Sequence, residues 1–504
     1  MCRFCRLLIS PILAIVALLG ACGGSTGPDA ENLLSSKDST RYAQICAKEN
    51  PHIKTDAGVI RLGSIEEEKK WIRAYMFERY LWYRDIPTLS LSAPQYNLTD
   101  SAGQPQVQAS LENLFQDSKN PKLTVSGSKV DKFSFMIDTY SWNNFSAGQD
   151  LGYGWMLKTV GTGASTRVQV AYVYPSTRQG LAFAQGVMRG DEILSVDGYS
   201  PADADPSRFY AALSPAQSGS HDFVFLRQGM QIRRTLQALE AELPQAEHRM
   251  VNVNGVRWGY LMFNSHVQSA EPALVQAMAD FRAQGIDELV VDLRYNGGGY
   301  LAIASALARA VAGPARTDNQ IFEMTRFNDK RSAENFAMGF YATTLFTGQV
   351  YPTLDLARIY VLTSDETCSA SESFINGLRG VDVQVIQVGT TTCGKPYGFY
   401  PQDNCGITYA AMEFEGVNAK GQGGFSDGLQ PVCVARENLT YPLADARESL
   451  FASAIAHRAG LACSSPNGLR MLGASGPGTA AGWPTEKLLR QGEWQRNKFV
   501  SSGR

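Results

Sequence analysis

The sequence lacks the excess of basic residues that nucleic-acid-binding proteins usually carry. Its 46 lysines and arginines are balanced by 48 aspartates and glutamates, which gives a formal net charge of −2. Because a nucleic-acid site generally needs a clustered basic surface, we expect no nucleic-acid partner. Beyond residue 19 there is also no apolar run of the roughly 20 residues that a membrane-spanning helix requires. We therefore expect a folded body that lies outside the bilayer.

Metal and nucleotide motifs are missing as well. The spacings of the nine cysteines match no zinc-binding pattern, and the glycine turn at 297–299 fits neither G-x-G-x-x-G nor the P-loop. We expect no metal and no organic cofactor. Histidine is scarce, and none of the five histidines has a distinctive neighbourhood. A serine–histidine hydrolase therefore has no local support, although the fold can still bring distant residues together.

The N-terminus has the features of a secretory signal. Two arginines precede an almost wholly apolar stretch, Leu7 to Leu19, which is too short to span a bilayer. The following Leu19-Gly20-Ala21-Cys22 resembles a bacterial lipobox, where cleavage precedes the cysteine and the thiol is acylated. We therefore predict a lipoprotein signal peptide at 1–21, lipidation of Cys22 and a polar linker at 22–45.

This leader gives an expected location. A lipidated chain is held at a membrane of the cell envelope, and we expect its body to face the periplasm. Gly23 follows the lipidated cysteine, in place of the acidic residue that retains some lipoproteins at the inner membrane. The sequence therefore favours the outer membrane.

Six cysteines remain once the leader and the lipidated residue are set aside. An even number in an oxidising compartment predicts up to three disulfides, with their connectivity left open. Metal binding and free buried thiols are the alternatives. The six are Cys46, Cys368, Cys393, Cys405, Cys433 and Cys463.

Hydrophobic periodicity divides the rest of the chain. Ser64 and Glu67 have capping-box spacing ahead of a helical apolar pattern, which predicts a small helical N-terminal region at 46–147. Short strands then follow one another at 148–242, with one short helix expected at 180–184.

The next region, 250–462, alternates strands with helices. An example is the strand Val256–Phe263, followed by the helix Glu271–Gln284, which Gly285 closes. This alternation predicts an α/β core in which helices flank a sheet. The remaining arm, 463–504, is a low-complexity segment rich in glycine, proline and serine and is expected to be poorly ordered.

Three short segments of the α/β region hold the candidate chemistry. A glycine turn at 297–299 ends the stretch that begins at Asp292, Ser369 lies between a strand and a helix, and Lys395 follows the next strand. Each has an ordinary explanation, because Ser369-x-x-Glu372 is also a capping-box pattern and a lone lysine is normally solvated. Together they supply a nucleophile, a base and backbone N–H groups that stabilise an oxyanion.

Lys395 is the candidate base because its sequence neighbourhood is apolar. It is the only charged residue from Val383 through Gln402. A lysine accepts a proton only when it is neutral, and lowering its pKa from about 10.4 to about 7.5 costs roughly 4 kcal/mol. Burial away from carboxylates shifts a lysine pKa in this direction.

These segments carry a family resemblance, together with the stretch Gly190-Asp191-Glu192-Ile193-Leu194-Ser195-Val196-Asp197-Gly198. They resemble the C-terminal processing (tail-specific) peptidases in their lipoprotein form, over residues 65 to 460. The resemblance implies a Ser–Lys serine peptidase with a ClpP/crotonase-like core and an inserted β-rich PDZ domain at 148–242. It assigns Ser369 as the nucleophile and Lys395 as the general base.

The resemblance also implies the remaining site residues. The backbone N–H groups of Ala370 and of the glycine turn would form the oxyanion hole, with Gly299 favoured over Gly298. The PDZ loop that binds a peptide carboxylate would include Gly152, Gly154 and Trp155.

One position departs from the family pattern. Many members place a glutamine four residues after the lysine, where it helps to orient the dyad, and here that position is Phe399. The flanking Cys368 and Cys393 would be close enough to form a disulfide if Ser369 and Lys395 touch.

The expected function is a cell-envelope serine endopeptidase. It would cleave unstructured or tail-exposed polypeptides, bound through their C-termini, by way of an acyl-enzyme. The alternative from another class is a catalytically silent PDZ-containing lipoprotein that binds peptides. Phe399 favours this alternative, whereas the retention of both Ser369 and Lys395 favours the enzyme.

Overall fold

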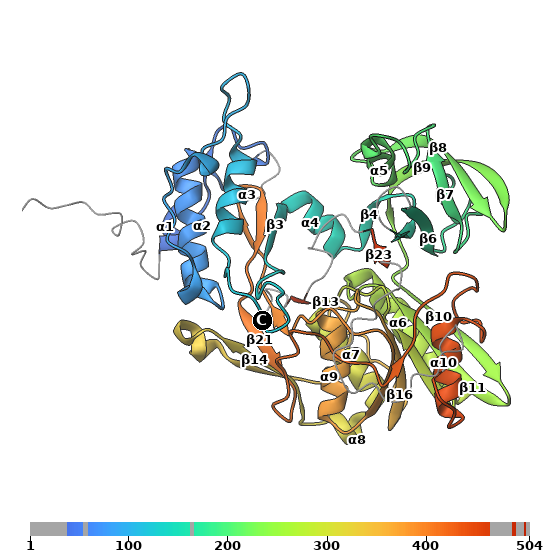
Figure 1. The fold of residues 1–504 in the computed structure, drawn as a ribbon. Helices are drawn as coiled ribbons and strands as arrows, with labels where there is room; N and C mark the ends of the chain where they lie inside the picture. The colour runs from blue at the N-terminus through green and yellow to red at the C-terminus, as the bar shows by residue number, and fades with distance from the viewer. Residues whose placement is uncertain (1–37, 54–58, 162–165, 464–485, 490–497, 500–504) are drawn as a thin grey trace, which may run out of the picture.

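The computed structural model describes residues 38–53, 59–161, 166–463, 486–489 and 498–499. The predicted signal peptide, Cys22 and most of the linker lie outside these ranges, as does most of the C-terminal arm. Among the described residues, no helix is both long and apolar enough to cross a membrane. Figure 1 shows a helical N-terminal part in blue, a β-rich part in green, and the α/β core beneath the β-rich part.

The core is built on a six-stranded sheet in the order β10-β11-β12-β16-β17-β22. β10 runs antiparallel to β11, and every other neighbouring pair in this sheet is parallel. Parallel strands are usually covered on both faces, and all five residues of β12 are buried. The strands are β10 (Ala246–Val253), β11 (Val256–Phe263), β12 (Glu288–Asp292), β16 (Arg358–Thr363), β17 (Gln384–Gly389) and β22 (Cys433–Val434).

Helices cover both faces of this sheet. Successive strand residues point to opposite faces, so Val291 lies in the same apolar cluster as α6, α7 and α9, whereas Val290 lies with α10. Gly285 ends α6 with φ of +60°, as the sequence predicts. The helices are α6 (Glu271–Gln284), α7 (Leu301–Ala312), α8 (Pro314–Thr317), α9 (Ala370–Gly380) and α10 (Ser449–Arg458).

The N-terminal part packs against strands from late in the sequence. Helix α2 begins after Ser64, which forms the predicted capping box with Glu67. Strand β3 pairs with β20, and α2 and α3 share an apolar cluster with Tyr409. The elements are α1 (Asp38–Tyr42), β1 (Ile45–Ala47), β2 (Arg61–Gly63), α2 (Ile65–Arg79), α3 (Val107–Asp117), β3 (Phe135–Asp138), α4 (Thr139–Ser146), β19 (Gln402–Asn404) and β20 (Ile407–Ala410).

A small four-stranded sheet, β15-β14-β21-β18, lies between the N-terminal part and the core (Figure 1). The sequence did not predict it, because its strands are short and pair across long separations, as β14 does with β21. Its last strand, β18, comes two residues after Lys395. The strands are β14 (Ile321–Phe327), β15 (Phe336–Gly339), β18 (Tyr397–Gly398) and β21 (Phe414–Val417).

The β-rich part is a seven-stranded sheet in the order β23-β5-β6-β7-β8-β9-β4. The helix predicted at 180–184 is wrong, because these residues form turns in which Gly180 has φ of +91°. The only helix of this part among the described residues is α5, which the sequence did not predict. The elements are β4 (Gln149–Gly152), β5 (Trp155–Val160), β6 (Arg167–Val173), β7 (Glu192–Val196), α5 (Ser207–Leu213), β8 (Gly219–Arg227) and β9 (Met230–Glu242).

Two short strands come from the segment predicted as a poorly ordered arm. β23 (Glu486–Leu488) pairs with β5, and β24 (Lys498–Phe499) pairs with β13 (Gly299–Tyr300). These residues therefore differ from the expectation of a poorly ordered arm. Strand edges elsewhere in the fold supply their backbone partners, and composition alone cannot reveal such partners.

The six remaining cysteines form three disulfides, the number that the sequence allowed. The pairing comes from the structure and includes the bridge suggested beside the candidate dyad. The disulfides are Cys46–Cys405, Cys368–Cys393 and Cys433–Cys463.

Candidate active site

Ser369 stands at the start of α9 in an unusual backbone conformation. Its φ of +63° lies in the left-handed region, which is uncommon outside glycine and often marks a functional constraint. The residue is fully buried, and its Oγ has no hydrogen-bond partner among the described residues. A buried hydroxyl without a partner costs free energy, so the fold keeps this group at a cost to stability.

A single carboxylate joins the segment of Ser369 to that of Lys395. Glu372 Oε2 accepts the backbone N–H groups of both residues, at 2.9 and 2.8 Å. Its Oε1 accepts the N–H of Gly394 at 2.9 Å and the hydroxyl of Thr392 at 2.5 Å. Burial raises the pKa of Glu372 above its usual value, although the four donors oppose the shift. The sequence indicated only a local capping residue here, so this clamp was missed.

A covalent link fixes the same two segments. Cys368 and Cys393 directly precede Ser369 and Gly394, and their Cα atoms lie 5.2 Å apart in the disulfide. The N–H of Cys393 also donates to the carbonyl of Thr367 at 3.0 Å. Cys368, Glu372 and Cys393 are near enough to suggest a metal site, but both sulfurs are already engaged in the disulfide.

The glycine turn is bonded to the nucleophile loop. The carbonyl of Asn296 accepts the N–H of Cys368 at 3.0 Å and the hydroxyl of Ser371 at 3.1 Å. Its side-chain Oδ1 accepts the N–H of Gly298 at 2.9 Å. That N–H is therefore engaged in this structure.

Gly299 cannot carry a side chain. It has φ of +135°, and an added Cβ would lie 2.3 Å from the carbonyl oxygen of His266. The bare backbone lets the turn lie directly against the segment of His266.

Lys395 is fully buried beside aromatic rings. Its Nζ lies 5.3 Å from the ring centroid of Phe133 and 5.5 Å from that of Phe399. Phe399 also packs edge-on against Phe135. No hydrogen bond joins Ser369 Oγ to this amine in this structure, since the hydroxyl has no described partner. Hydrogen bonds between catalytic groups often tighten only when substrate binds.

His266 lies against the glycine turn, which the sequence did not predict. Its Nδ1 is 3.0 Å from Asn296 Oδ1, while Nε2 is buried with no described partner. Because Oδ1 can only accept, Nδ1 carries the proton. Burial lowers the pKa of His266 to about 3, so the imidazole is neutral near pH 7.

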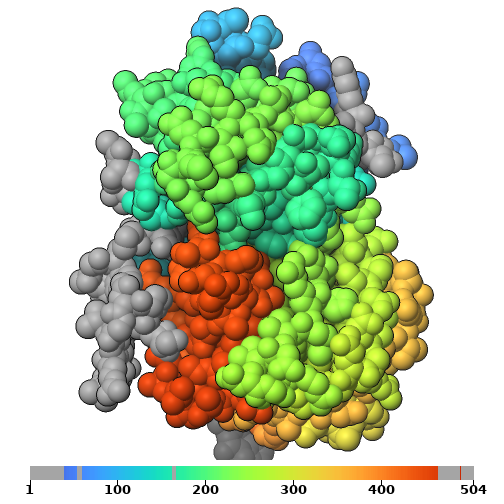
Figure 2. All heavy atoms as spheres, turned by 90° about the vertical axis from the view of Figure 1, so that its right-hand side faces the viewer, coloured from blue at the N-terminus to red at the C-terminus, as the bar shows by residue number. Residues whose placement is uncertain are grey.

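A buried charge network connects the β-rich part to the glycine-turn segment. Arg294 bonds Asp292 and Glu448 with all three side chains buried. Arg189 of the β-rich part donates to Tyr295 at 2.8 Å and to Glu437 at 2.8 Å. Burial alone would raise the pKa of Glu437, but three neighbouring cations together hold it well below its usual range. Figure 2 shows the face where the green β-rich part rests on the core.

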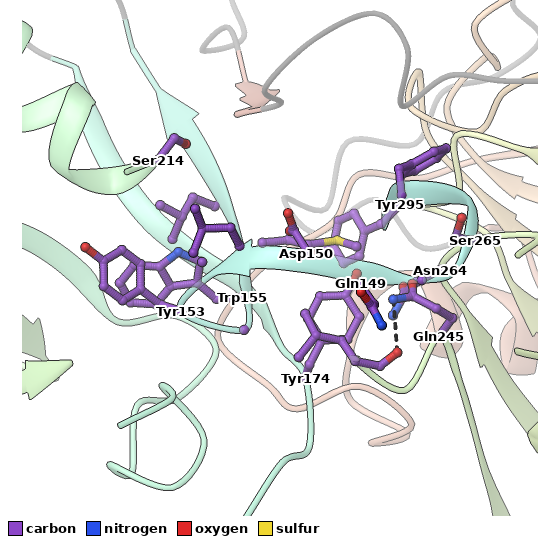
Figure 3. Close-up of a pocket in the computed structure, with 18 of the residues that line it drawn as sticks. Gln149, Asp150, Tyr153, Trp155, Tyr174, Ser214, Gln245, Asn264, Ser265 and Tyr295 are labelled. Carbon is purple, nitrogen blue, oxygen red and sulfur yellow. Dashed lines mark hydrogen bonds between the residues drawn. The ribbon is translucent and has the colours of Figure 1, made fainter. Parts of the chain in front are cut away.

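The three residues predicted as a peptide-binding loop line one pocket. Gly152, Gly154 and Trp155 are among its lining residues. Figure 3 shows Trp155 toward one end of the pocket and Asn264 and Ser265 of the core at the other. Residues 264 and 265 directly precede His266, which contacts the glycine turn. The pocket therefore extends from the β-rich sheet toward the segments of the site.

The sequence segments that form this site match known protein-family models. Residues 257–400 match the model of peptidase family S41, and residues 67–135 match the peptidase S41 N-terminal domain. The first range contains the glycine turn, Ser369 and Lys395. Over these two ranges the chain carries domains of peptidase family S41.

Relatives of this S41 chain include two curated proteins. The carboxy-terminal processing protease CtpB of Bacillus subtilis is 24% identical over 272 residues, 53% of this chain and 51% of that protein. The carboxyl-terminal-processing protease of Picosynechococcus is 24% identical over 216 residues, 42% of this chain and 48% of that protein. The match thus spans about half the length of each relative.

A solved structure supports the fold. A crystal structure from Bacteroides fragilis, assigned to the S41 proteases, is 23% identical and covers 77% of this chain and 97% of its own, with a TM-score of 0.60. The S41 chain therefore has the α/β fold of these proteases.

Proposed function

We propose that this protein is a serine endopeptidase in which Ser369 is the nucleophile and Lys395 the general base. The observation that carries the proposal is the shared carboxylate of Glu372, which accepts the backbone N–H of both residues. Two segments 26 positions apart are thereby held in register beside a glycine turn. A structural capping residue would need only the first of these bonds.

The chemistry follows from this arrangement. Ser369 Oγ attacks the scissile carbonyl while its proton passes to the neutral Nζ of Lys395. The N–H groups of Ala370 and Gly299 stabilise the oxyanion. The C–N bond then breaks as Nζ returns the proton to the leaving amine. Water then attacks the acyl-enzyme while Nζ takes one of its protons, and Nζ returns that proton to Ser369 Oγ as the ester C–O bond breaks.

The surroundings of Lys395 bear on its protonation state. Desolvation of a buried lysine moves its pKa down by up to about 3–5 units, which at 1.36 kcal/mol per unit is about 4–7 kcal/mol. The rings of Phe133 and Phe399 favour the ammonium ion, by about 2 kcal/mol or more for a desolvated contact. Burial acts in the direction of the neutral base that the mechanism needs, and the two rings oppose it.

The β-rich part would act as a PDZ domain inserted ahead of a ClpP/crotonase-like core. A polypeptide C-terminus would add as a strand to the edge of β5, with its carboxylate near Gly152 and Gly154. The pocket that runs on to residues 264 and 265 supports a route from this edge to the site. The substrates would be unstructured or tail-exposed polypeptides.

The proposed location is the cell envelope. The lipobox-like segment ending at Cys22 supports a lipid anchor, with the body facing the periplasm and the outer membrane favoured. Mass spectrometry of the mature N-terminus tests this directly, because the proposal requires a diacylglyceryl-modified Cys22 and a free chain beginning at Cys22 would contradict it.

Hydrolysis of unfolded polypeptides that differ only at their C-termini tests the activity. The parent is expected to cleave them at rates that depend on the last residues, whereas Ser369→Ala cleaves none. If Ser369→Ala keeps the activity of the parent, the proposal is wrong. If neither protein cleaves but both bind the C-termini, the chain is a silent peptide-binding protein.

A serine–histidine mechanism is separated by a second pair of variants. His266 is the histidine that contacts the site segments, although no hydrogen bond joins it to Ser369. The proposal predicts that Lys395→Ala abolishes hydrolysis and His266→Gln retains most of it. The reverse pattern would assign the base to His266.

A further inference from the structure

The edge of β5 is occupied by the protein's own C-terminal segment. β23 pairs antiparallel with β5 in the register Glu486↔Val160, Lys487↔Thr159 and Leu488↔Lys158. The N–H of Leu489 donates to the carbonyl of Leu157 at 2.9 Å, which extends the pairing by one residue. On its other side β5 pairs with β6. Without β23, the described part of the sheet would end at an open edge of the kind that binds extended peptides.

The direction of β23 and its side-chain contacts resemble those expected of a peptide bound at the edge of β5. Moving along β23 from Glu486 to Leu489, the chain runs toward Gly154 and Gly152, the end of β5 where a bound carboxylate would lie. Leu488 is only 9% exposed and belongs to the apolar cluster that contains Tyr174 and Leu243. Leu488 and Leu489 both line the pocket drawn in Figure 3.

A second described part of the C-terminal arm lies beside the glycine turn. β24, nine residues beyond Leu489, pairs in parallel with Gly299 and Tyr300 of the glycine turn. β24 also contacts β18, the strand that directly follows the segment of Lys395. Residues 486–489 therefore occupy the peptide edge, and residues 498–499 occupy a strand position against the proposed oxyanion donor.

We propose that residues 486–489 and 498–499 act as a built-in peptide ligand that competes with polypeptide substrates for this site. The inference rests on the proposed function, because it takes β5 as the edge that binds substrate. Because this ligand belongs to the same chain, its effective concentration is taken as on the order of 1 mM, so a segment with an intrinsic Kd of about 0.1 mM weakens binding from solution about tenfold. Release of the segment would open the site.

A binding experiment tests this without catalysis. The probe is a fluorescein-labelled synthetic peptide of residues 483–504, measured by polarisation against full-length Ser369→Ala. Adding Leu488→Asp should weaken docking of the built-in segment and tighten probe binding about tenfold. Leu461→Asp is the matched control, because Leu461 is 65% exposed, and it should leave the Kd unchanged. An equal Kd in all three proteins would overturn the inference.

A second measurement covers the possibility that Leu488→Asp misfolds. A cleavage site for an exogenous protease, inserted at 474–478 of the full chain, lets the segment be cut and diluted away after folding. Cut protein should bind the probe about tenfold more tightly than uncut protein, and equal binding would overturn the inference.

The two proposals fail in different ways. If probe binding changes as expected but a fluorophosphonate never labels Ser369, the built-in ligand stands and the peptidase assignment fails. If Ser369 is labelled at one rate in the parent and in Leu488→Asp, and probe binding is also unchanged, the peptidase stands and the built-in ligand is wrong.

Discussion

Removal of the Cys368–Cys393 disulfide should reduce activity far more than removal of a thermodynamically matched disulfide. The protein contains a second disulfide of similar loop length, because Cys368–Cys393 spans 25 residues and Cys433–Cys463 spans 30. Each pair also joins one buried cysteine to one partly buried cysteine. The two disulfides differ mainly in position, since only the first flanks the proposed dyad.

The expected losses of stability are nearly equal. Loop closure entropy at 25 °C gives about 3.5 kcal/mol for the first loop and about 3.6 kcal/mol for the second. Removing the bridge between Cys368 and Cys393 also loosens the segments of Ser369 and Lys395, which are then held by the hydrogen bonds of Glu372 and by the backbone bond from Cys393 to Thr367. A displacement of about 1 Å at reacting groups can cost about 10²-fold in rate. We therefore expect a 10- to 100-fold loss of kcat for this pair alone.

The assay compares the Cys368→Ala/Cys393→Ala and Cys433→Ala/Cys463→Ala proteins. Unfolding free energies come from urea titration, and kcat is measured on an unfolded polypeptide well below both unfolding transitions. The reasoning predicts similar unfolding free energies, with kcat reduced only in the first protein. Equal kcat values in two equally destabilised proteins would refute the claim that this disulfide positions the dyad.

Three further predictions concern buried charges. Glu372→Gln sets an amide donor against backbone donors, so we expect a stability loss of about 1–3 kcal/mol and a lower kcat with little change in KM; unchanged kinetics would contradict its positioning role. Arg294→Met leaves the buried carboxylate of Glu448 without this ion pair and should lower the free energy of unfolding by about 3–5 kcal/mol in a urea titration. A loss below 1 kcal/mol would contradict a stabilising role for this network of buried charges. Burial raises the pKa of Glu68 from 4.5 to about 7. The contribution of Glu68 to the free energy of unfolding is therefore fully present below pH 4.5. About 3 kcal/mol of it is lost as the pH rises to about 7. Glu68→Gln should lack this part of the pH dependence, and an unchanged pH profile would contradict the assignment.

Local patterns predicted much of the core. The helix Glu271–Gln284 agrees with its sequence-based bounds because apolar periodicity and the closing Gly285 both act within a few residues. The strand Val256–Phe263 agrees for the same reason, as an apolar run bounded by polar turns. The segments of Ser369 and Lys395 were found because each carries a distinctive short motif.

Interactions between residues far apart in the sequence could not be predicted from local patterns. Glu372 fits a local capping pattern, and nothing in its neighbourhood signals that its second role is to hold the N–H of Lys395. Arg294 reaches Glu437 and Glu448 across 143 and 154 positions. His266 likewise meets the glycine turn only because β11 and β12 are adjacent in the sheet.

The arm shows a different limit of sequence analysis. Residues 486–489 belong to a segment whose composition predicts poor order, yet their backbone is paired because β5 has a free edge. Short strands of this kind depend on the partner rather than on their own propensity.

The rate of fluorophosphonate labelling of Ser369, followed against pH in the parent and in Lys395→Ala, tests the central claim most directly. The account predicts labelling that rises as the amine loses its proton, and a rate about 10²- to 10⁴-fold lower without the base. Equal labelling rates in the two proteins, or labelling with no pH dependence, would contradict a Ser–Lys dyad.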